Sequence, residues 1–586
     1  MNIFALAGDA VRQALSALQE QGQLDREIKL SGLEIQEPRD PSHGDLASNA
    51  AMALAKRAKA KPRDLAQLIS DQLAVNPAFA KVDIAGPGFI NLTLADEIWC
   101  QLVQSVVNGQ GRYGQAELGQ DRTVQVEYVS ANPTGPMHVG HCRGAVFGDT
   151  LANLLSFAGY EVSREYYVND AGAQVDKLGQ SALLRYREAL GEEIGEIPDG
   201  LYPGDYMKAV GQDLVEQHGS NLLDLPENEA VVIARDTAIS ALLGEIKDDL
   251  AALNVRHDIF FSERSLATDK RDQVAEAIEI LREKSLIYEG RLPKPLGHDD
   301  NDWEDREQTL FRSTEFGDDI DRALKKSDGS YTYFANDVAY HMNKIERNFS
   351  LYFNVLGADH VGYIPRLKAV VSALSDNQAN FETPVTQLVK VLRDGQPVRM
   401  SKRAGTFVAL RDVVDEVGSD PVRFMMMMRK HDSPLDFDLA KVVEQSKENP
   451  VFYVQYAHAR AESVFRVAAE TFPQLGKDSE LVKNADLELL TDVGERALIR
   501  EIARFPRIIE GAAREREPHR VPFYLYDLAS AFHHQWARGN DSPQLRFSQI
   551  DDVKITASRL ALVLATQTVI SSGLYILGVQ APLEMR

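Results

Sequence analysis

Two histidines lie three positions apart in the segment His138-Val139-Gly140-His141, where a predicted strand gives way to a predicted helix. This spacing places both imidazoles on one helical face near its N-terminus. Donors held there stabilise the negative charge that builds on phosphate oxygens when a carboxylate attacks the α-phosphate of ATP. Gly140 has no side chain, so a flat base can approach its backbone closely. Taken alone, the two histidines are equally consistent with an ordinary helix end.

A second motif, RMSKR at 399–403, lies far downstream and is followed by AGT. Its cations and small residues suit a loop that closes over departing phosphates. An isolated match of this kind is more often a solvated basic turn. The pair of motifs is more specific than either one.

In order, separation and setting, the two motifs resemble the HIGH and KMSKS signatures of class I aminoacyl-tRNA synthetases. The ATP contacts that this resemblance implies are His138, Gly140, His141, Met400, Ser401 and Lys402. We expect His138, His141 and Lys402 to be the catalytic residues. Arg399 stands where the pattern has its first lysine, so we assign the stabilisation of pyrophosphate to Lys402.

The chain around the first motif predicts the element order that would position it. VQVEYVS has the pattern of a strand, HVGHCRGAVFGDTLANLLSFAG that of a helix and EVSREYYVND that of another strand. This βαβ unit predicts a parallel sheet. The strand pattern returns in LYFNVLGADH and TQLVKVLRDG. We therefore predict a Rossmann-like α/β catalytic domain over residues 120–430, with a mainly helical insertion at about 175–325.

Two further domains are predicted, because 586 residues exceed what one hydrophobic core usually organises. Residues 1–110 combine helical runs with the strand-like segments KVDIAG and GFINLTLA, which predicts an α+β domain. Residues 432–586 carry long helical patterns without strand alternation, which predicts an all-α bundle.

Composition narrows the class of protein. The hydrophobic fraction of 44% and charged fraction of 26% are those of a soluble globular protein. The only cysteines, Cys100 and Cys142, cannot form a four-thiolate site, so we expect no structural zinc. We also expect a cytoplasmic protein without a membrane partner. The net charge of −23 means that a nucleic-acid partner would have to be bound through local basic patches.

A site for a guanidinium needs carboxylates and hydrogen-bond acceptors. Glu127 lies on the predicted strand before the first motif, and Asn132 lies in the loop that follows. Tyr333 and Asp337 are four positions apart, hence on one helical face. Each has an ordinary alternative: Glu127 could pair with a lysine, Asn132 could cap a helix and Tyr333 could be core.

Four segments resemble bacterial arginyl-tRNA synthetases in particular: VEYVSANPTGPMHVGH, YYVNDAGAQ, TYFANDVAYHMNK and GADHVGYIPRLKAV. The resemblance implies that Tyr333 and Asp337 hold the guanidinium of L-arginine, assisted by Glu127. It implies that Asn132 contacts the α-amino and carboxylate groups.

Asp359 and His360 follow a glycine at a predicted strand end, where open α/β sheets bind ligands. We expect them on the ATP side of the site. A helix cap is the alternative for Asp359.

The same resemblance implies contacts with tRNA. An N-terminal domain of this family reads the tRNA elbow, and Asn91 in GFINL fits the contact residue there. The C-terminal bundle resembles the family's anticodon-binding domain through DPVRF, PVFYVQYAHAR and YLYDLASAFHHQW. Tyr453 and Arg460 are the expected contacts on its first long helix, and Met585 the expected contact near the C-terminus.

The resemblance to this family implies arginine–tRNA ligase activity. ATP, with Mg²⁺, converts L-arginine to arginyl-adenylate, and tRNA(Arg) accepts the arginyl group with release of AMP. The resemblance further implies that bound tRNA is needed for adenylate formation, and we expect a monomer. Three alternatives stay open: a class I synthetase for another amino acid, a non-catalytic tRNA-binding relative and a small-molecule nucleotidyltransferase with an HxGH site.

Overall fold

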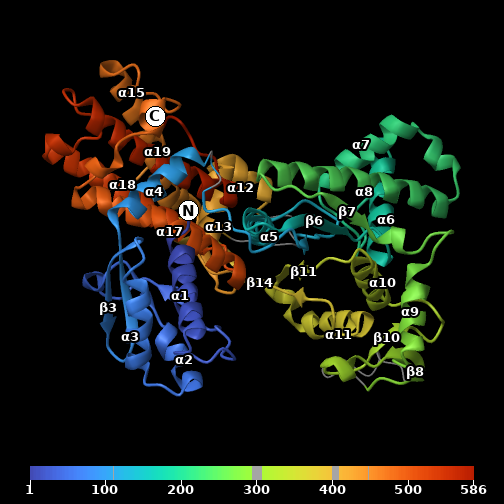
Figure 1. The fold of residues 1–586 in the computed structure, drawn as a ribbon. Coiled ribbons are helices and arrows are strands. Elements are labelled where there is room, and N and C mark those ends of the chain that lie inside the picture. Colours follow the sequence, from blue (N-terminus) through green and yellow to red (C-terminus); the bar gives the residue numbers. More distant parts are fainter. Residues whose placement is uncertain (110, 112, 294–305, 399–407, 447, 586) are drawn as a thin grey trace.

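The computed structural model describes residues 1–109, 111, 113–293, 306–398, 408–446 and 448–585. It has an N-terminal α+β domain, a catalytic α/β domain with an insertion and a C-terminal helical domain (Figure 1). The N-terminal and helical domains lie side by side at one end of the molecule, and the insertion lies at the other.

The N-terminal domain is built on a four-stranded antiparallel sheet of order β1-β2-β4-β3. Its strands are β1 (Ile35–Gln36), β2 (Leu46–Ser48), β3 (Phe79–Ala85) and β4 (Phe89–Leu94), and its helices are α1 (Ile3–Glu20), α2 (Ala50–Ala58) and α3 (Pro62–Leu73). Pro62 begins α3, where its missing N–H costs nothing. Gly86 and Gly88 adopt positive φ in the turn between β3 and β4.

The catalytic sheet has five strands in the order β13-β11-β5-β6-β7, and every pair is parallel. The strands are β5 (Thr123–Glu127), β6 (Glu161–Val168), β7 (Ile259–Ser262), β11 (Leu351–Asn354) and β13 (Phe381–Glu382). Helix α5 (Val139–Phe157) connects β5 to β6, as the sequence predicts. The central strands β5 and β11 are almost entirely buried, as expected of a sheet covered on both faces.

The insertion contains the helices α6 (Ala173–Ala189), α7 (Tyr206–His218) and α8 (Glu227–Ala252), which pack together. It continues with α9 (Gln273–Glu283) and a three-stranded antiparallel sheet of β8 (Ile287–Gly290), β9 (Gln308–Phe311) and β10 (Arg322–Lys325). Strand β7 falls inside the segment predicted as insertion, yet it forms one edge of the catalytic sheet. Its four residues are too short a run to give a strand signal between long helices.

Helices α10 (Tyr333–Glu346) and α11 (Ile364–Ser375) return the chain to the catalytic domain. The short strands β12 (Leu356–Gly357), which precedes α11, and β14 (Val385–Thr386), which follows it, pair in parallel. The last sheet combines β15 (Val389–Arg393), β16 (Gln396–Pro397) and β17 (Leu435–Asp438). Between its strands lie α12 (Leu410–Val417) and α13 (Ser419–Met427). β17 corrects the expectation that only helices follow residue 432, because it pairs in parallel with β15.

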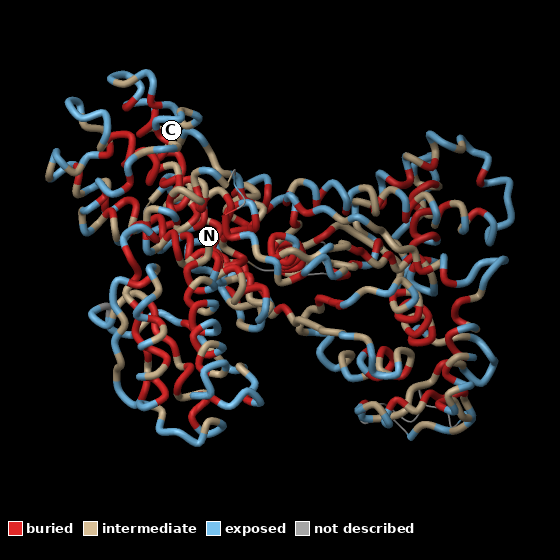
Figure 2. The backbone as a smooth tube through the Cα atoms, viewed as in Figure 1, coloured by how far each residue is buried: buried red, intermediate tan, exposed pale blue. Residues whose placement is uncertain are grey.

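The C-terminal domain is a bundle around one apolar helix. Its helices are α14 (Leu439–Val442), α15 (Pro450–Thr471), α16 (Glu480–Lys483), α17 (Val493–Glu515), α18 (Arg520–Asp541) and α19 (Val553–Leu577), and α4 (Asp96–Asn108) packs against α19. Among the described residues, α19 alone is long and apolar enough to cross a membrane, but 78% of its most apolar window is buried. Figure 2 shows buried residues concentrated in this bundle and where it meets the catalytic domain. α19 is thus the core helix of the bundle.

Candidate active site

The two histidines of the first motif hold the N-terminus of α5. His138 is the N-cap residue, and its Nδ1 accepts a hydrogen bond from the Gly140 N–H at 3.1 Å. Nδ1 of His141 accepts from the His138 N–H at 3.2 Å, and the two rings stack with centroids 3.9 Å apart. Because Nδ1 is the acceptor in each ring, a neutral ring carries its proton on Nε2. Both imidazoles are therefore set to donate from Nε2.

The residues that follow the second motif form backbone hydrogen bonds with the residues around the first motif. The Val139 N–H donates to the Val408 carbonyl at 3.1 Å, and the Leu410 N–H donates to the Met137 carbonyl at 2.9 Å. The motif residues predicted to bind ATP, Met400, Ser401 and Lys402, lie outside the described residues.

Glu127 is buried at the end of β5 and is contacted by other side chains of the chain. Its Oε2 accepts a hydrogen bond from Lys344 Nζ and lies 3.0 Å from the Tyr340 hydroxyl. Its Oε1 accepts from the Ser130 hydroxyl at 3.1 Å. Lys344 also donates to Asn354 Oδ1 at 2.6 Å. Glu127 therefore forms the pair with a lysine that is the ordinary alternative to a substrate-binding role.

Asp337 lies in the second turn of α10, where the Tyr363 hydroxyl donates a hydrogen bond to its Oδ2. Burial raises the pKa of Asp337 to about 7, and the carboxylates of Glu263 and Glu127 add to the rise. Burial also raises the pKa of Glu263, which accepts a hydrogen bond from Asn336. Three acidic groups thus share one low-dielectric region. A bound cation would relieve their repulsion.

Sequence reasoning missed Glu263 and Tyr363. Glu263 directly follows β7, so it lies at the same carboxyl edge of the parallel sheet as Glu127. Recognising FFS as a strand would have pointed to it, because ligands bind beyond the carboxyl ends of such strands. Tyr363 ends the turn Ala358–Tyr363 before α11, and nothing in the local sequence reveals its contact with Asp337.

Tyr333 and Asn132 are accessible. Tyr333 is 61% exposed at the first turn of α10, and its ring packs over Gly172, where an added Cβ would lie 3.0 Å from Cε1. Asn132 is exposed, and its Nδ2 donates to Gln174 Oε1 at 3.2 Å. Between Glu127 and Asn132 the backbone takes positive φ at Val129. For a β-branched residue that conformation is strained, as is common beside functional sites.

Asp359 and His360 lie in the exposed turn after β12. His360 Nε2 is 3.5 Å from Asp359 Oδ2, and both side chains are largely exposed. Both are accessible to a ligand at this edge of the molecule.

The predicted tRNA contacts differ in accessibility. Asn91 is buried in β4. Arg460 on α15 lies between the rings of Tyr456 and Trp536, with its guanidinium carbon 4.4 and 5.1 Å from their centroids. Its Nη1 donates to His533 Nδ1 at 2.8 Å.

Tyr453 and Met585 are half-buried. The Tyr453 ring packs against His533, with centroids 4.5 Å apart. His458 on the same helix is buried, and its Nδ1 donates to the Pro582 carbonyl at 2.8 Å. His458 thus holds the C-terminal segment that carries Met585.

Three family models together cover nearly the whole chain. They are the arginyl tRNA synthetase N terminal domain over residues 6–94, the class I (R) tRNA synthetase catalytic domain over 102–460 and the DALR anticodon binding domain over 454–585. The chain is 58% identical to the arginine–tRNA ligase of Nitrobacter winogradskyi, over 100% of this chain and 99% of that protein. It is 56% identical to that of Xanthobacter autotrophicus over the full length of both. This chain belongs to the arginyl-tRNA synthetase family.

The solved structures agree with this family in fold. An arginyl-tRNA synthetase of Thermus thermophilus matches 99% of this chain and 100% of its own with a TM-score of 0.71 at 20% identity. A methionyl-tRNA synthetase of Mycobacterium tuberculosis matches 78% of this chain and 91% of its own with a TM-score of 0.52 at 12% identity. The predicted family, fold class and arginine–tRNA ligase activity are confirmed. Because the chain belongs to this family, two of the alternatives are excluded. These are a synthetase for another amino acid and a small-molecule nucleotidyltransferase.

Proposed function

We propose which residues carry the activation of L-arginine with ATP to arginyl-adenylate and the transfer of the arginyl group to the 3′ end of tRNA(Arg). Arginine–tRNA ligase is the activity of its family, and the proposal adds the roles of individual residues. The observation that carries it is the group of acidic side chains in which Asp337 of α10 lies near Glu263, directly after β7, and near Glu127, at the end of β5, the strand that leads into HVGH.

The guanidinium of arginine lies against Asp337 and the Tyr333 ring. Asp337 supplies the charge, and the exposed ring supplies a flat surface for the planar cation. Glu127 assists through the buried contacts that fix it beside Lys344. Asn132, exposed in the loop after β5, binds the α-amino and carboxylate groups and so directs the carboxylate toward His138.

In the first step a carboxylate oxygen of arginine forms a bond to the α-phosphorus of ATP, and the bond to pyrophosphate breaks. His138 and His141 donate from Nε2 to the phosphate oxygens, while the N-terminus of α5 favours their negative charge. Gly140, Asp359 and His360 contact ATP, together with Met400, Ser401 and Lys402. Lys402 neutralises the departing pyrophosphate.

In the second step the 3′-terminal adenosine hydroxyl of tRNA attacks the carbonyl carbon of the adenylate, and AMP leaves. We assign Asn91 to the tRNA elbow from the family resemblance alone, since its side chain is buried in β4. Tyr453, Arg460 and Met585 contact the anticodon region. Tyr453 and Arg460 belong to the aromatic cluster on α15 and α18, and such rings stack with bases.

Mg²⁺ enters with ATP and reduces the repulsion between its phosphates. The described part of the chain holds no group of three or more His, Cys, Asp or Glu side chains able to bind a resident ion. The protein acts as a monomer, which light scattering tests. It acts in the cytoplasm, which cell fractionation tests.

The decisive experiment is ATP–pyrophosphate exchange with each amino acid, with and without total tRNA. Exchange that needs both arginine and tRNA supports the proposal, and exchange with another amino acid overturns it. Asp337→Ala abolishes arginine-dependent exchange while circular dichroism stays unchanged. Glu346→Gln is the matched control, since Glu346 is an exposed carboxylate on the same helix, paired with Arg271.

A further inference from the structure

The catalytic domain caps the C-terminal end of α19. The carbonyls of Ile576, Leu577 and Gly578 accept hydrogen bonds from Asn153 Nδ2 at 3.2 Å, Arg423 Nε at 2.7 Å and Asn254 Nδ2 at 2.9 Å. The last carbonyls of a helix lack partners within the helix and carry the negative end of its dipole. Here three separate elements of the catalytic domain supply the missing donors, and one donor is a cation. The core helix of the bundle is thereby attached to the catalytic domain at its end.

Arg423 on α13 is the centre of this junction and is fully buried. Its Nη1 donates to the carbonyls of Leu253 and Asn254 at 3.1 and 3.0 Å, and its Nη2 donates to Asp149 at 2.5 Å. Gly578 has a φ of +65°, and a Cβ there would collide with the guanidinium. A buried charge pair with this many directional bonds tolerates little displacement of its partners. Arg423 therefore ties α19, the end of α8 and α5 together.

Helix α5 extends this junction to the reaction centre. Asp149 and Asn153 lie on the helix whose N-terminus carries His138 and His141. The intrahelical hydrogen bonds make one helix of this length a stiff unit. A displacement at Asp149 therefore moves both imidazoles relative to the ATP that they contact.

The start of α13 connects the junction to the predicted tRNA contacts. Asp420 accepts a hydrogen bond from Gln455 Nε2 at 2.8 Å and from the Gln580 N–H at 3.2 Å. Gln455 belongs to α15, the helix of Tyr453 and Arg460. It also donates to the Gln580 carbonyl at 3.0 Å. One short helix, α13, thus holds α15 and the C-terminal segment at Asp420 and holds α19 and α5 at Arg423.

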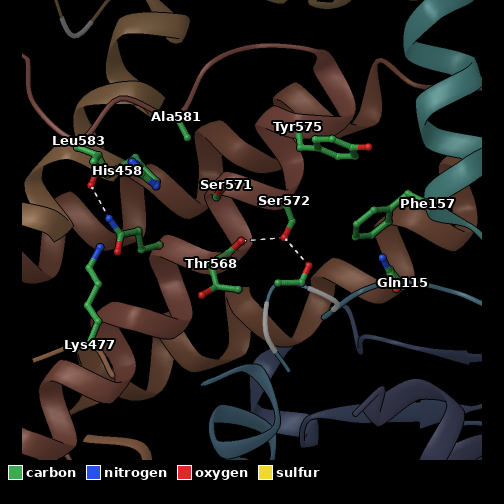
Figure 3. A pocket seen from close by; sticks show the side chains of 12 residues that line it. Gln115, Phe157, His458, Lys477, Thr568, Ser571, Ser572, Tyr575, Ala581 and Leu583 are labelled. Carbon is green, nitrogen blue, oxygen red and sulfur yellow. Dashed lines mark hydrogen bonds between the residues drawn. The ribbon is translucent and has the colours of Figure 1, made fainter. Parts of the chain in front are cut away.

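A hollow of about 720 Å³ lies beside α19 and the C-terminal segment (Figure 3). The hollow is lined by Phe157 of α5, Ser572 and Tyr575 of α19, and Ala581 and Leu583 of the C-terminal segment. The segment therefore runs beside open space on this side, and Tyr575 is 69% exposed. Elements with few packed neighbours shift at low cost in free energy. Apart from its hydrogen bonds at Gln580 and Pro582, the C-terminal segment has room to move when tRNA binds next to it.

We propose that Arg423 is a positioning residue for adenylate formation. When tRNA binds to α15 and the C-terminal segment, it acts through Arg423 and so determines the position of α5, the helix that begins at HVGH. The inference rests on the proposed function, because it concerns the same ATP-dependent step. Bound tRNA acts on Asp420, α13 transmits the displacement to Arg423, and the Arg423–Asp149 pair transmits it to α5. A purely structural anchor would lower activity whichever tRNA is bound.

The test compares two variants with a control in ATP–pyrophosphate exchange at saturating tRNA. Arg423→Lys removes the forked donors but keeps the charge. Asn254→Gly removes one capping side chain at an exposed position with φ of +57°, which glycine adopts freely, so this variant folds. Glu382→Gln is the control, because it breaks another contact between the two domains, with Arg516, that involves neither Arg423 nor its hydrogen-bond partners. Each is assayed with native tRNA(Arg) and with a transcript whose anticodon is replaced.

With native tRNA, both variants lower kcat for exchange by about tenfold, the size of a typical coupling between sites, while tRNA Kd and arginine KM stay unchanged. With the altered transcript, wild type and variants are equally slow. Glu382→Gln behaves as wild type with both. An equal fractional loss with both tRNAs, a loss confined to Kd, or no loss overturns the inference. Absence of arginine-dependent exchange in the wild type would instead overturn the proposed function.

Discussion

The Tyr363 hydroxyl donates a hydrogen bond to Oδ2 of Asp337, joining the turn before α11 to the second turn of α10. The bond favours the ionised carboxylate, whereas burial and the neighbouring Glu263 and Glu127 favour the protonated one. The balance leaves the pKa of Asp337 at about 7. The charge that we propose to bind the substrate cation is thus sensitive to pH in the neutral range.

Arginine activation should therefore lose efficiency as the pH falls below about 7. A guanidinium binds the ionised carboxylate, and the raised pKa means that protonation removes this form below neutrality. We expect kcat/KM for arginine to fall about tenfold per pH unit there. The pH profile of exchange, with pyrophosphate and ATP held saturating, measures this fall. A flat profile below neutral pH would contradict it.

Tyr363→Phe should move that profile to higher pH. Removing the hydroxyl takes away a hydrogen bond that lowers the pKa of Asp337, and burial is left to act with less opposition. A midpoint shifted upward by about one pH unit is expected, equal to about 1.4 kcal/mol. Profiles of the variant and the wild type are compared under the same conditions. A downward shift would show that Asp337 is not the titrating group.

Lys344→Met should destabilise the folded protein by about 3–5 kcal/mol, because it leaves Glu127 buried without its cation. Urea denaturation measures the free energy of unfolding. The double variant Lys344→Met/Glu127→Gln should recover part of the loss, since no unpaired charge stays buried. Lys208→Met, which breaks an exposed pair with Asp205, should cost about 1 kcal/mol or less. Equal losses for both lysine variants would refute the argument.

Gly140→Ala should lower kcat for exchange by about a hundredfold with little change in arginine KM. A Cβ at Gly140 would lie 2.8 Å from Nδ1 and Cε1 of His138, so the imidazole must leave its bond to the Gly140 N–H. Gly244→Ala on α8 is the control, because a Cβ there meets nothing within 4 Å. Full activity of Gly140→Ala would mean that the position of the His138 ring is immaterial.

Arg460→Met should weaken tRNA binding and lower its salt dependence. Loss of one phosphate-neutralising cation reduces the slope of log Kd against log salt by about one. Binding titrations at several salt concentrations give this slope. Arg282→Met, an exposed arginine on α9, serves as the control and should leave the slope unchanged. A lower affinity with an unaltered slope would assign Arg460 to packing between Tyr456 and Trp536 alone.

The sequence predicts what depends on neighbours along the chain. The position of the histidine motif at the start of a helix follows from the local sequence pattern. The N-cap of α5 at His138 agrees with this prediction. Strands β7 and β17 escape prediction because four residues between helices carry too little periodicity.

The side-chain partners that the sequence does not identify are far apart in it. The Glu127–Lys344 pair spans 217 positions and the Tyr363–Asp337 bond spans 26. Only the three-dimensional structure shows such contacts. The acid beside Asp337 that the sequence did not reveal, Glu263, was missed because its strand was missed.

The core position of α19 has a consequence for the order in which the chain folds. Ribosomes make α15, α17 and α18 first, and all three pack against a helix that is made later. Until α19 emerges, their apolar faces have no common partner and stay open to chaperones and proteases. A nascent chain halted before Val553 would therefore carry a formed catalytic sheet beside an unassembled bundle.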